Sequence, residues 1–452
     1  MNDGLIQTTE SLCPVCLRVL PAEIRRRGGE VMLGRVCPEH GRFEEAIWRG
    51  EPDFETWRRP KRPAAGVAPQ QPPGRGCPYD CGLCPEHGQH PCTILVEITS
   101  HCNLRCPVCF ADSGRGEESF TPLATLTEQL AWIHRQTGRE VVLQLSGGEP
   151  TLYPELPELV AEGARLFSAV QLNTNGLKLA EEPGLARHLA RAGLSWVFLQ
   201  FDGVSDRVFE IIRGRPLWAE KKAALENCAE AGLAVVLVPT VAAGVNDHEL
   251  GDLVRLAISL PSVRGVHIQP MTASGRNNLS GAAHRLTLPE VLARLSQQTG
   301  GLIRPEQAFP PGCEHERCSF VLRYRRTAEG QLIPMAGGGC GCKTTTTPST
   351  PTETADNRRR SVEVVLNSWQ GPAPPGLTIP MAKPAVRDGF DEFLALARQQ
   401  TFSVTAMAFQ DVWTVDLERL RGCCVHIFRP PNRFIPFCAC NLTSAEGRPL
   451  YR

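Results

Sequence analysis

Nineteen cysteines are the residues of this 452-residue sequence most able to do chemistry. All except Cys228 fall into four groups, within residues 13–37, 77–109, 313–342 and 423–440. Disulfides are not the default in a reducing compartment, and cysteines that serve only as small buried side chains would be scattered. Clustering at short spacings therefore predicts metal sites. We expect the lone Cys228 to be core packing.

The central group contains a C-x3-C-x2-C loop formed by Cys102, Cys106 and Cys109. Three thiolates at this spacing can hold three corners of a [4Fe–4S] cluster, which leaves the fourth iron open to a small molecule. An open coordination position distinguishes a catalytic metal centre from a structural one. A zinc site would need a fourth ligand nearby, and His101 adjoins Cys102 too closely to serve. We therefore predict that these three cysteines carry the catalysis.

The loop directly follows the first of six short apolar runs that alternate with amphipathic stretches. The predicted strands span residues 93–99, 141–146, 169–174, 196–201, 234–240 and 265–270. Strands that are apolar on both faces and separated by helices predict an α/β fold with a parallel sheet covered by helices. A doubly wound sheet and a barrel share this periodicity.

The cysteine loop resembles the defining motif of radical S-adenosylmethionine (SAM) enzymes. This resemblance implies that the amino and carboxylate groups of SAM chelate the open iron of a [4Fe–4S] cluster. One electron from the reduced cluster then splits SAM into methionine and a 5′-deoxyadenosyl radical that takes hydrogen from a substrate. It also implies a partial (βα)6 TIM-like barrel, here with cysteine-rich N- and C-terminal metal-binding extensions. Residues at the carboxyl ends of the strands are the functional ones in such barrels.

Further blocks follow the order expected from this resemblance. The segment from Gly147 to Pro150 reads GGEP and resembles the motif that binds the SAM amino group. The implied SAM-binding residues are Gly147, Gly148, Glu149, Pro150, Asn173, Asn175, Asp202, Arg213 and Gln269.

A second C-x3-C-x2-C spacing lies upstream, before the first strand. Cys77, Cys81 and Cys84 are followed by Cys92, which makes a closed four-thiolate set. We assign these four to an auxiliary [4Fe–4S] cluster. A structural zinc is the alternative, with His87 or His90 as a different fourth ligand.

Two knuckles stand at the N-terminus, one of C-x2-C type and one of C-x2-H type. They offer Cys13, Cys16, Cys37 and His40 as four tetrahedral ligands. Such a set suits zinc or a mononuclear iron of the rubredoxin type.

Near the C-terminus, two β-rich arms flank a Pro-Pro-Asn-Arg turn and predict a hairpin. Its ends would bring Cys423 or Cys424 near Cys438. Cys313 and Cys318 supply another pair, and we expect a second auxiliary cluster on Cys313, Cys318, Cys423 and Cys438. Cys340 and Cys342 compete as ligands from a Gly-rich segment.

The chain divides into five predicted parts with a low-complexity insert at 343–357. These are a rubredoxin-like or zinc-knuckle module (1–58), a Pro-rich linker (59–76), an auxiliary-cluster segment (77–92), the barrel (93–300) and a C-terminal auxiliary-cluster domain (301–452).

The resemblance extends over nearly the whole chain to a subgroup of radical SAM enzymes that contains an archaeal tetraether lipid synthase and proteins proposed to methylate a dihydropterin. It implies hydrogen abstraction from an unactivated sp3 carbon, and we expect C–C bond formation on a lipid chain. C-methylation of a pterin or another heterocycle is one alternative. A non-catalytic iron–sulfur electron carrier is another, which the GGEP block disfavours. The implied cofactors are SAM, its [4Fe–4S] cluster, one or two auxiliary [4Fe–4S] clusters and mononuclear iron or zinc.

Lys and Arg total 48, as do Asp and Glu, which gives a formal charge of zero. This balance argues against bulk binding to nucleic acid. The N-terminus shows no apolar signal stretch and no apolar run reaches the length of a membrane span. We expect a soluble cytoplasmic protein with a small-molecule or lipid substrate and a reductant such as flavodoxin or ferredoxin.

Overall fold

The structure is a computed structural model, and it describes residues 3–59, 74–82, 86–114, 119–277, 279, 285–335, 359, 362–370 and 400–452. Most of the linker, the insert at 343–357 and the cysteines Cys84, Cys340 and Cys342 lie outside these residues. The described strands form a large mixed sheet, a four-stranded N-terminal sheet and one short two-stranded pair.

The large sheet contains the six predicted strands, which are confirmed in sequence order as one parallel run. They are β5 (Thr93–Thr99), β7 (Val142–Gly147), β8 (Ala169–Thr174), β9 (Trp196–Gln200), β10 (Val235–Val238) and β12 (Val263–Pro270). Each pairs in parallel with the next. The short β11 (Thr240–Val241) continues β10 and pairs with the end of β12.

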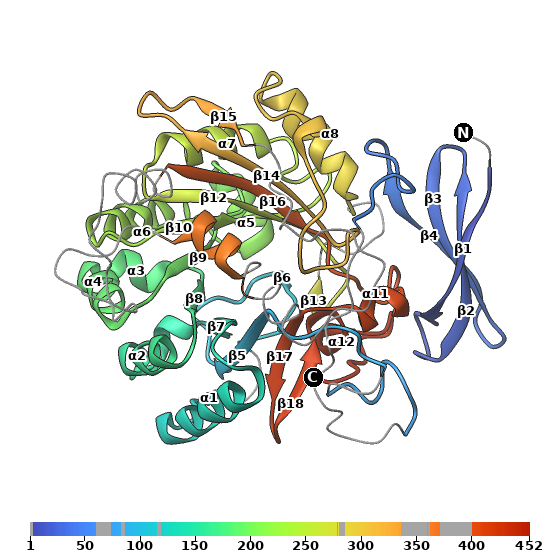
Figure 1. The fold of residues 1–452 in the computed structure, drawn as a ribbon, viewed down its shortest axis with the longest axis horizontal. Helices are drawn as coiled ribbons and strands as arrows, with labels where there is room; N and C mark the ends of the chain where they lie inside the picture. The colour runs from blue at the N-terminus through green and yellow to red at the C-terminus, as the bar shows by residue number, and fades with distance from the viewer. Residues whose placement is uncertain are drawn as a thin grey trace.

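Helices follow one another around the outer side of this curved sheet (Figure 1). They are α1 (Leu123–Thr137), α2 (Leu156–Leu166), α3 (Leu177–Glu181), α4 (Pro183–Ala192), α6 (Trp218–Glu230) and α7 (Leu250–Ser259). By contrast, α5 (Asp206–Arg213) packs against the cysteine loop through Val208 and Phe209. Cys228 is fully buried on α6 within the main hydrophobic core, as expected for a packing residue. A mostly parallel sheet with helices outside is the predicted α/β barrel fold.

The C-terminal part adds strands to both edges of the parallel run. At one edge β16 (Thr401–Met407) pairs in parallel with β12, and β14 (Ser319–Arg326) and β15 (Leu332–Pro334) follow antiparallel. At the other edge β17 (Val425–Arg429) pairs in parallel with β5 and forms an antiparallel hairpin with β18 (Arg433–Pro436). The predicted C-terminal hairpin is therefore confirmed. Short helices flank it, α11 (Leu417–Arg421) and α12 (Phe437–Asn441).

Alternate residues of the strands face the inside of the curved sheet. Along β9, Val197 and Leu199 belong to the main core, whereas Trp196 and Phe198 belong to a separate inner cluster. A short helix at 362–369 packs against that inner cluster through Trp369, whose ring centre lies 5.1 Å from that of Phe198. Side chains of β9 and of this helix thus fill part of the barrel interior at this level.

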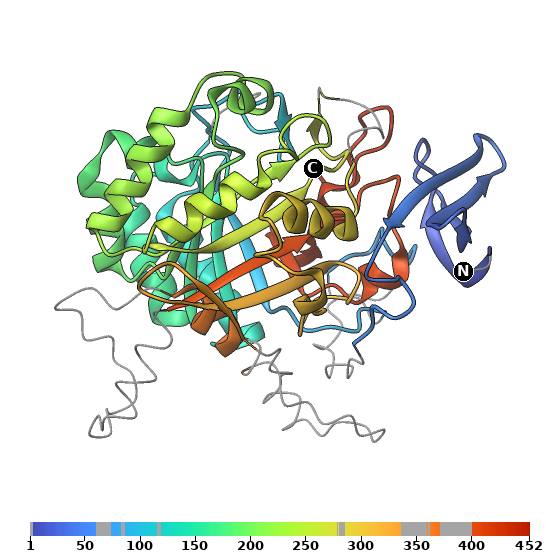
Figure 2. The same ribbon diagram turned by 90° about the horizontal axis from the view of Figure 1, so that it is seen from above.

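The N-terminal sheet is an antiparallel meander that stands beside the barrel (Figure 2). Its strands are β1 (Gly4–Leu12), β2 (Val19–Arg27), β3 (Glu30–Cys37) and β4 (Gly41–Arg49). It is joined to the C-terminal part by hydrogen bonds, among them Thr9 Oγ1 to Asp416 at 2.6 Å and Arg35 Nη2 to the Val412 carbonyl at 3.0 Å.

Another helix, α8 (Leu288–Gln298), packs against α7 and β4. Within the described ranges, no helix combines the length and the apolar character needed to cross a membrane.

Candidate active site

A pocket of about 1030 Å³, open solvent included, lies at the carboxyl ends of the parallel strands. Cys102, Cys106 and Cys109 all line it. The predicted SAM-binding residues that also line it are Gly147, Gly148, Glu149, Asn173, Asn175, Arg213 and Gln269. Pro150 and Asp202 are not among its lining residues and lie buried behind it.

The two glycines of the GGEP segment are held against the entrance of the cysteine loop. The Gly148 amide donates to the Thr99 carbonyl at 2.8 Å, and the Glu149 amide donates to the His101 carbonyl at 2.7 Å. A Cβ on Gly148 would lie 2.1 Å from the His101 oxygen. Only glycine permits this approach, and Gly147 also has a φ of +132°. The segment therefore sets the position of the cysteine loop relative to β7.

The carboxylate of Glu149 is buried and accepts several hydrogen bonds from protein donors. One oxygen accepts from the hydroxyls of Thr151 and Thr174, each at 2.6 Å, and the other accepts from the Asn175 amide at 2.7 Å. We expected a contact to SAM from this side chain. These contacts join the end of β8 to the turn after β7, and because Glu149 also lines the pocket, its contact to SAM stays a prediction.

Asn175 connects β8 to the cysteine loop in the same way. Its side-chain amide donates to Asn103 Oδ1 at 2.8 Å, and its own oxygen accepts from the Leu177 amide at 2.9 Å. Asn173 Oδ1 accepts from Gln171 at 2.6 Å. Both asparagines still line the pocket.

Asp202 and Arg213 form a buried bidentate ion pair behind the pocket. Arg213 Nε and Nη2 each lie 2.7 Å from a different oxygen of Asp202. Burial alone would lower the pKa of Arg213, but the Asp202 carboxylate raises it above its ordinary value. Arg213 Nη1 also donates to the Val108 carbonyl at 3.2 Å, which lies between two of the cysteines.

Arg276 is a positioning residue that the sequence reasoning missed. It lies on β13 (Arg276–Asn277), which pairs with β6 (Val108–Cys109) inside the cysteine loop. Its guanidinium donates to the Cys106 carbonyl at 2.7 Å and to Asp112 at 2.6 Å. No motif in the sequence marked this residue.

Lys221 was also missed, because it reads as a solvated charge on an amphipathic helix. It is fully buried and donates to the Asn175 carbonyl at 2.5 Å. Burial lowers its pKa to about 8, although the Asp202 charge opposes that shift.

The donor set of the pocket fits the open cluster of a SAM enzyme. Around the pocket, the described lining residues include no fourth cysteine and no histidine. Burial raises the pKa of Cys102 to about 12 and also raises that of Cys106. Iron binding must therefore displace protons from these thiols, as thiolate ligation generally does.

Two further thiol sets lie together in the C-terminal part, and their membership differs from the expected grouping. Cys92 Sγ lies 3.0 Å from Cys313 Sγ, and Cys424 hydrogen-bonds to both thiols. We had grouped Cys92 with Cys77, Cys81 and Cys84. The reason for the difference is pairing of β5 with β17, which places the Cys92 amide 2.9 Å from the Cys424 carbonyl.

The other set contains Cys318, Cys423 and Cys438. Cys423 and Cys318 both add to the pKa rise that burial causes at Cys438. Arg419 Nη2 donates to Cys318 Sγ at 3.2 Å, and the Gln410 amide donates to Cys438 Sγ at 3.3 Å. Three of the four cysteines expected for the second auxiliary cluster thus lie together, and the fourth, Cys313, lies with the first set.

Cys77 and Cys81 form a third, smaller group. They line one small space with His87, and a hydrogen bond with Cys81 lowers the pKa of Cys77. Cys84, their expected partner, lies outside the described residues. The alternative ligand His87 has its Nε2 2.8 Å from the Cys423 carbonyl, and His90 has its Nδ1 3.1 Å from the Pro91 carbonyl.

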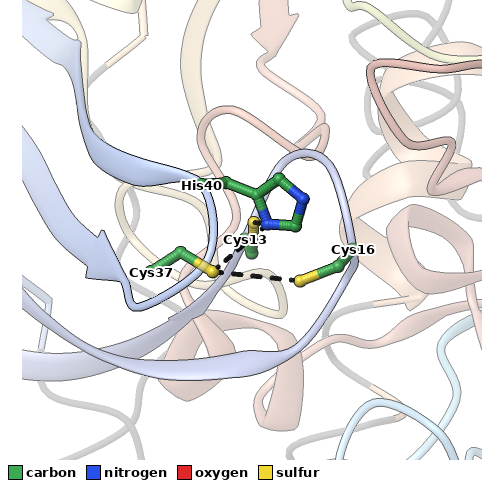
Figure 3. Close-up of side chains that lie close together, drawn as sticks. All are labelled: Cys13, Cys16, Cys37 and His40. Carbon is green, nitrogen blue, oxygen red and sulfur yellow. Dashed lines mark hydrogen bonds between the residues drawn. The ribbon is translucent and has the colours of Figure 1, made fainter.

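At the N-terminus the two knuckles meet between the strand ends of the small sheet (Figure 3). The ligand atoms of Cys13, Cys16, Cys37 and His40 all lie within 4.8 Å of one another. Cys37 Sγ is 3.4 Å from His40 Nδ1 and 4.0 Å from Cys16 Sγ. Tetrahedral zinc with Zn–S bonds of about 2.3 Å places its sulfur ligands about 3.8 Å apart, so the arrangement fits a metal.

Electrostatics at this site favour a thiolate. Burial would raise the pKa of Cys37, but hydrogen bonds from His40 and from nearby backbone amides lower it to about 6. The pKa of Cys13 shifts the other way, because burial raises it above the ordinary value of a cysteine thiol.

Comparison with known proteins agrees with this geometry. The profile of the radical SAM superfamily matches residues 96–257, and that of the HMPTM N-terminal zinc ribbon domain matches residues 5–49. The chain belongs to the radical SAM superfamily, whose members use SAM and a [4Fe–4S] cluster.

A relative extends this match to almost the full length. The chain is 30% identical over 473 residues to a 7,8-dihydro-6-hydroxymethylpterin dimethyltransferase of Methanocaldococcus jannaschii, which covers 96% of this chain and 93% of the relative. It is 28% identical over 344 residues to molybdenum cofactor biosynthesis protein 1 of Bos taurus, covering 70% of this chain and 50% of that protein. The structure of Streptococcus suis SuiB bound to S-adenosylmethionine superposes with a TM-score of 0.39 at 16% identity over 48% of each chain.

Proposed function

We propose that this radical SAM enzyme methylates a ring carbon of a reduced pterin. The observation that carries the proposal is the match over 96% of this chain to the archaeal dihydropterin dimethyltransferase, together with the N-terminal zinc ribbon. This similarity favours the heterocycle alternative over the lipid coupling that we expected first.

The residues of the pocket serve to hold and orient SAM and the substrate. When bound to the three cysteines, the cluster together with SAM supplies a 5′-deoxyadenosyl radical. Gly147 and Gly148 leave room for the cysteine loop, and the Arg213–Asp202 pair holds the loop from behind. Met271 and Phe409 add apolar side chains to the lining of this pocket, which favours exclusion of water around bound SAM and substrate.

We assign the two C-terminal thiol sets to auxiliary [4Fe–4S] clusters. In the first set Cys92 lies 3.0 Å from Cys313 and hydrogen-bonds to Cys424, and in the second the charges of Cys318 and Cys423 act on Cys438. Cysteine thiolates are the usual ligands of iron–sulfur clusters in proteins. Clusters on these sets would suit storage of electrons or binding of a substrate intermediate. The N-terminal set suits one zinc or iron ion. We propose a structural role for this ion, because it would connect the two turns that carry its four ligands.

The assay that tests the proposal supplies the reconstituted protein with SAM, dithionite and 7,8-dihydro-6-hydroxymethylpterin under anaerobic conditions. We expect pterin products heavier by one or two methylene units, detected by mass spectrometry. S-adenosylmethionine labelled in its methyl group distinguishes SAM from another source of the added carbon. Unchanged pterin in an enzyme that cleaves SAM would contradict the proposal.

Coupling of lipid chains is a second candidate, and one structural observation favours it. A cavity inside the barrel has a largely apolar lining that includes Phe309, Val321, Val365, Trp369 and Met407. It also reaches Cys313 of the first auxiliary set, so an alkyl chain could lie beside a cluster. Coupled alkyl chains formed from a phospholipid substrate, with no methylated pterin, would establish this function instead.

Either reaction needs a one-electron donor. We propose flavodoxin or ferredoxin as the reductant, in the cytoplasm, because radical SAM clusters must be reduced before SAM is split.

A further inference from the structure

A second hollow adjoins the SAM pocket on the side of the N-terminal sheet. It measures about 460 Å³, open solvent included. The two spaces share a wall formed by residues 270–272 and Phe409. The other walls come from β4, from the segment before α8 and from the C-terminal part around α11, and α8 and β4 contact one another there. The hollow is therefore within reach of a ligand seated over the cysteines.

Three arginines line this hollow: Arg285, Arg317 and Arg419. Arg285 has its charge neutralised locally, since it lies 2.5 Å from Asp411 and 3.5 Å from Glu45. Arg317 and Arg419 form no such ion pair with a carboxylate among the described residues.

Arg317 carries a buried charge with no carboxylate in contact. Arg317 is 7% exposed. Among the described residues, no carboxylate forms an ion pair with its guanidinium group within 4 Å. Its guanidinium carbon lies 3.4 Å above the ring of Phe54, and its Nη1 makes one long contact of 3.4 Å to Gln7. Its Nε has no hydrogen-bond partner.

Arg419 is 9% exposed and also keeps its Nε without a hydrogen-bond partner. Its Nη2 donates to Cys318 Sγ, so the hollow also borders the second thiol set. The Asp416 carboxylate accepts from Thr9 Oγ1 at 2.6 Å and from the Glu418 amide at 3.1 Å, and its charge also acts favourably on Arg419. Two guanidinium groups thus border one hollow. Arg317 forms no ion pair within the described residues, whereas Arg419 is held by the Cys318 thiol.

We propose that this hollow binds a phosphate group of the substrate. A phosphate offers several oxygens to forked guanidinium donors that approach from different walls, which a buried arginine favours over water. The inference rests on the proposed function and narrows its substrate to a phosphate ester of the reduced pterin alcohol. The ring would lie in the SAM pocket and the phosphate beyond Phe409.

The test measures binding of inorganic phosphate and pyrophosphate to the iron-loaded enzyme by calorimetry, with acetate as the comparison anion. We expect pyrophosphate to bind more tightly than acetate. Arg317→Met should weaken pyrophosphate binding at least about tenfold. Arg27→Met is the matched control, because the Arg27 side chain is 70% exposed on the N-terminal sheet and should leave binding unchanged.

A second variant guards against loss of folding in Arg317→Met. Ala408 lines the hollow, so Ala408→Asp would place a carboxylate beside the guanidinium groups. We expect this variant to fold with full iron content and to lose pyrophosphate binding.

Formation of 5′-deoxyadenosine from SAM without substrate should be unchanged in both variants. Pyrophosphate that binds the wild type no better than acetate, or equally well to Ala408→Asp, overturns the inference. Failure of SAM cleavage in the wild type would instead refute the proposed function, so the two failures are distinguishable. With substrates, the phosphate ester should show a KM at least about tenfold below that of the free alcohol, and Ala408→Asp should remove the difference.

Discussion

Arg213 and Asp202 form a bidentate pair with two contacts of 2.7 Å, and the same guanidinium reaches the Val108 carbonyl inside the cysteine loop. Both side chains are almost fully buried. Both charged groups are therefore shielded from water, and each depends on the other for compensation of its charge. The pair fixes the position of the cysteine loop relative to the end of β9.

Replacing Asp202 with Asn should loosen that loop and leave the buried charge of Arg213 uncompensated. We expect a loss of about 3 kcal/mol in stability, typical for breaking a buried ion pair from one side. Misplaced ligands should also slow SAM cleavage on the order of tenfold to a hundredfold. Thermal unfolding and 5′-deoxyadenosine formation measure the two effects. Asp252→Asn, which breaks the exposed pair with Arg255, is the control and should change neither. Equal behaviour of the two variants would refute this role.

Adding one methyl group at Gly148 should displace the cysteine loop. The Cβ of Gly148→Ala would fall 2.1 Å from the His101 carbonyl oxygen. We expect SAM cleavage to fall roughly a hundredfold, since small displacements of reacting groups have effects of that size. Gly184→Ala lies on α4 with nothing within 4 Å of the new methyl, and it should retain full activity. An active Gly148→Ala enzyme would show that the close approach is not required.

The sequence predicted the six parallel strands and their order because each is an apolar run bounded by turns and followed by an amphipathic helix. It also predicted the C-terminal hairpin, whose Pro-Pro-Asn-Arg turn is a strong local signal. Cys13, Cys16, Cys37 and His40 could be grouped as one site from two close pairs, and their ligand atoms do lie together. These successes rest on short-range patterns.

Contacts between distant segments were harder to predict. Pairing of β5 with β17 brings Cys92 beside Cys424, and Cys313, which is 221 positions from Cys92, joins them there. Arg276 holds the Cys106 carbonyl from 170 positions away without any motif. The carboxylate of Glu149, predicted to contact SAM, also accepts hydrogen bonds from Thr174 and Asn175 at the end of β8, which the sequence did not indicate. Neither spacing nor residue type reveals such tertiary partners.

The two auxiliary thiol sets make a prediction about iron content. Cys92→Ala and Cys313→Ala should each remove about four irons, and the double variant should remove no more than either single one. The pair Cys313→Ala and Cys318→Ala should lose about twice as much, because the structure places these cysteines in different sets. Iron and sulfide analysis of the reconstituted variants gives the counts. Cys228→Ala is the control and should lose none.

The opposite pattern would favour the grouping expected from the sequence. In that case Cys313→Ala and Cys318→Ala would share one loss, while Cys92→Ala would add a separate one.

The buried His267 should make the barrel sensitive to acid. Burial lowers the pKa of His267 to about 4, from an ordinary value near 6.5, and its Nδ1 lies 2.8 Å from Thr405 Oγ1. Between those values the unfolded chain binds a proton that the native state does not, so stability falls as pH falls from about 6.5 toward 4. The full effect is about 3 kcal/mol at most.

His267→Gln should reduce this decline, measured as hydrogen-exchange protection of β12 amides between pH 7.5 and 5 after correction for intrinsic rates. His248→Gln at the surface is the control and should keep the wild-type slope. An unchanged slope in His267→Gln would mean that other groups cause the acid sensitivity.

Cleavage of SAM by the intact protein tests the central claim most directly. The protein is purified without oxygen, loaded with iron and sulfide, and incubated with SAM and dithionite, and 5′-deoxyadenosine is quantified. We predict deoxyadenosine from the wild type and from Cys228→Ala, and none from the variant in which Cys102, Cys106 and Cys109 are all replaced by Ala. A fully loaded wild type that forms no deoxyadenosine, or a triple variant that forms as much as the wild type, would contradict the assignment of this pocket to radical SAM chemistry.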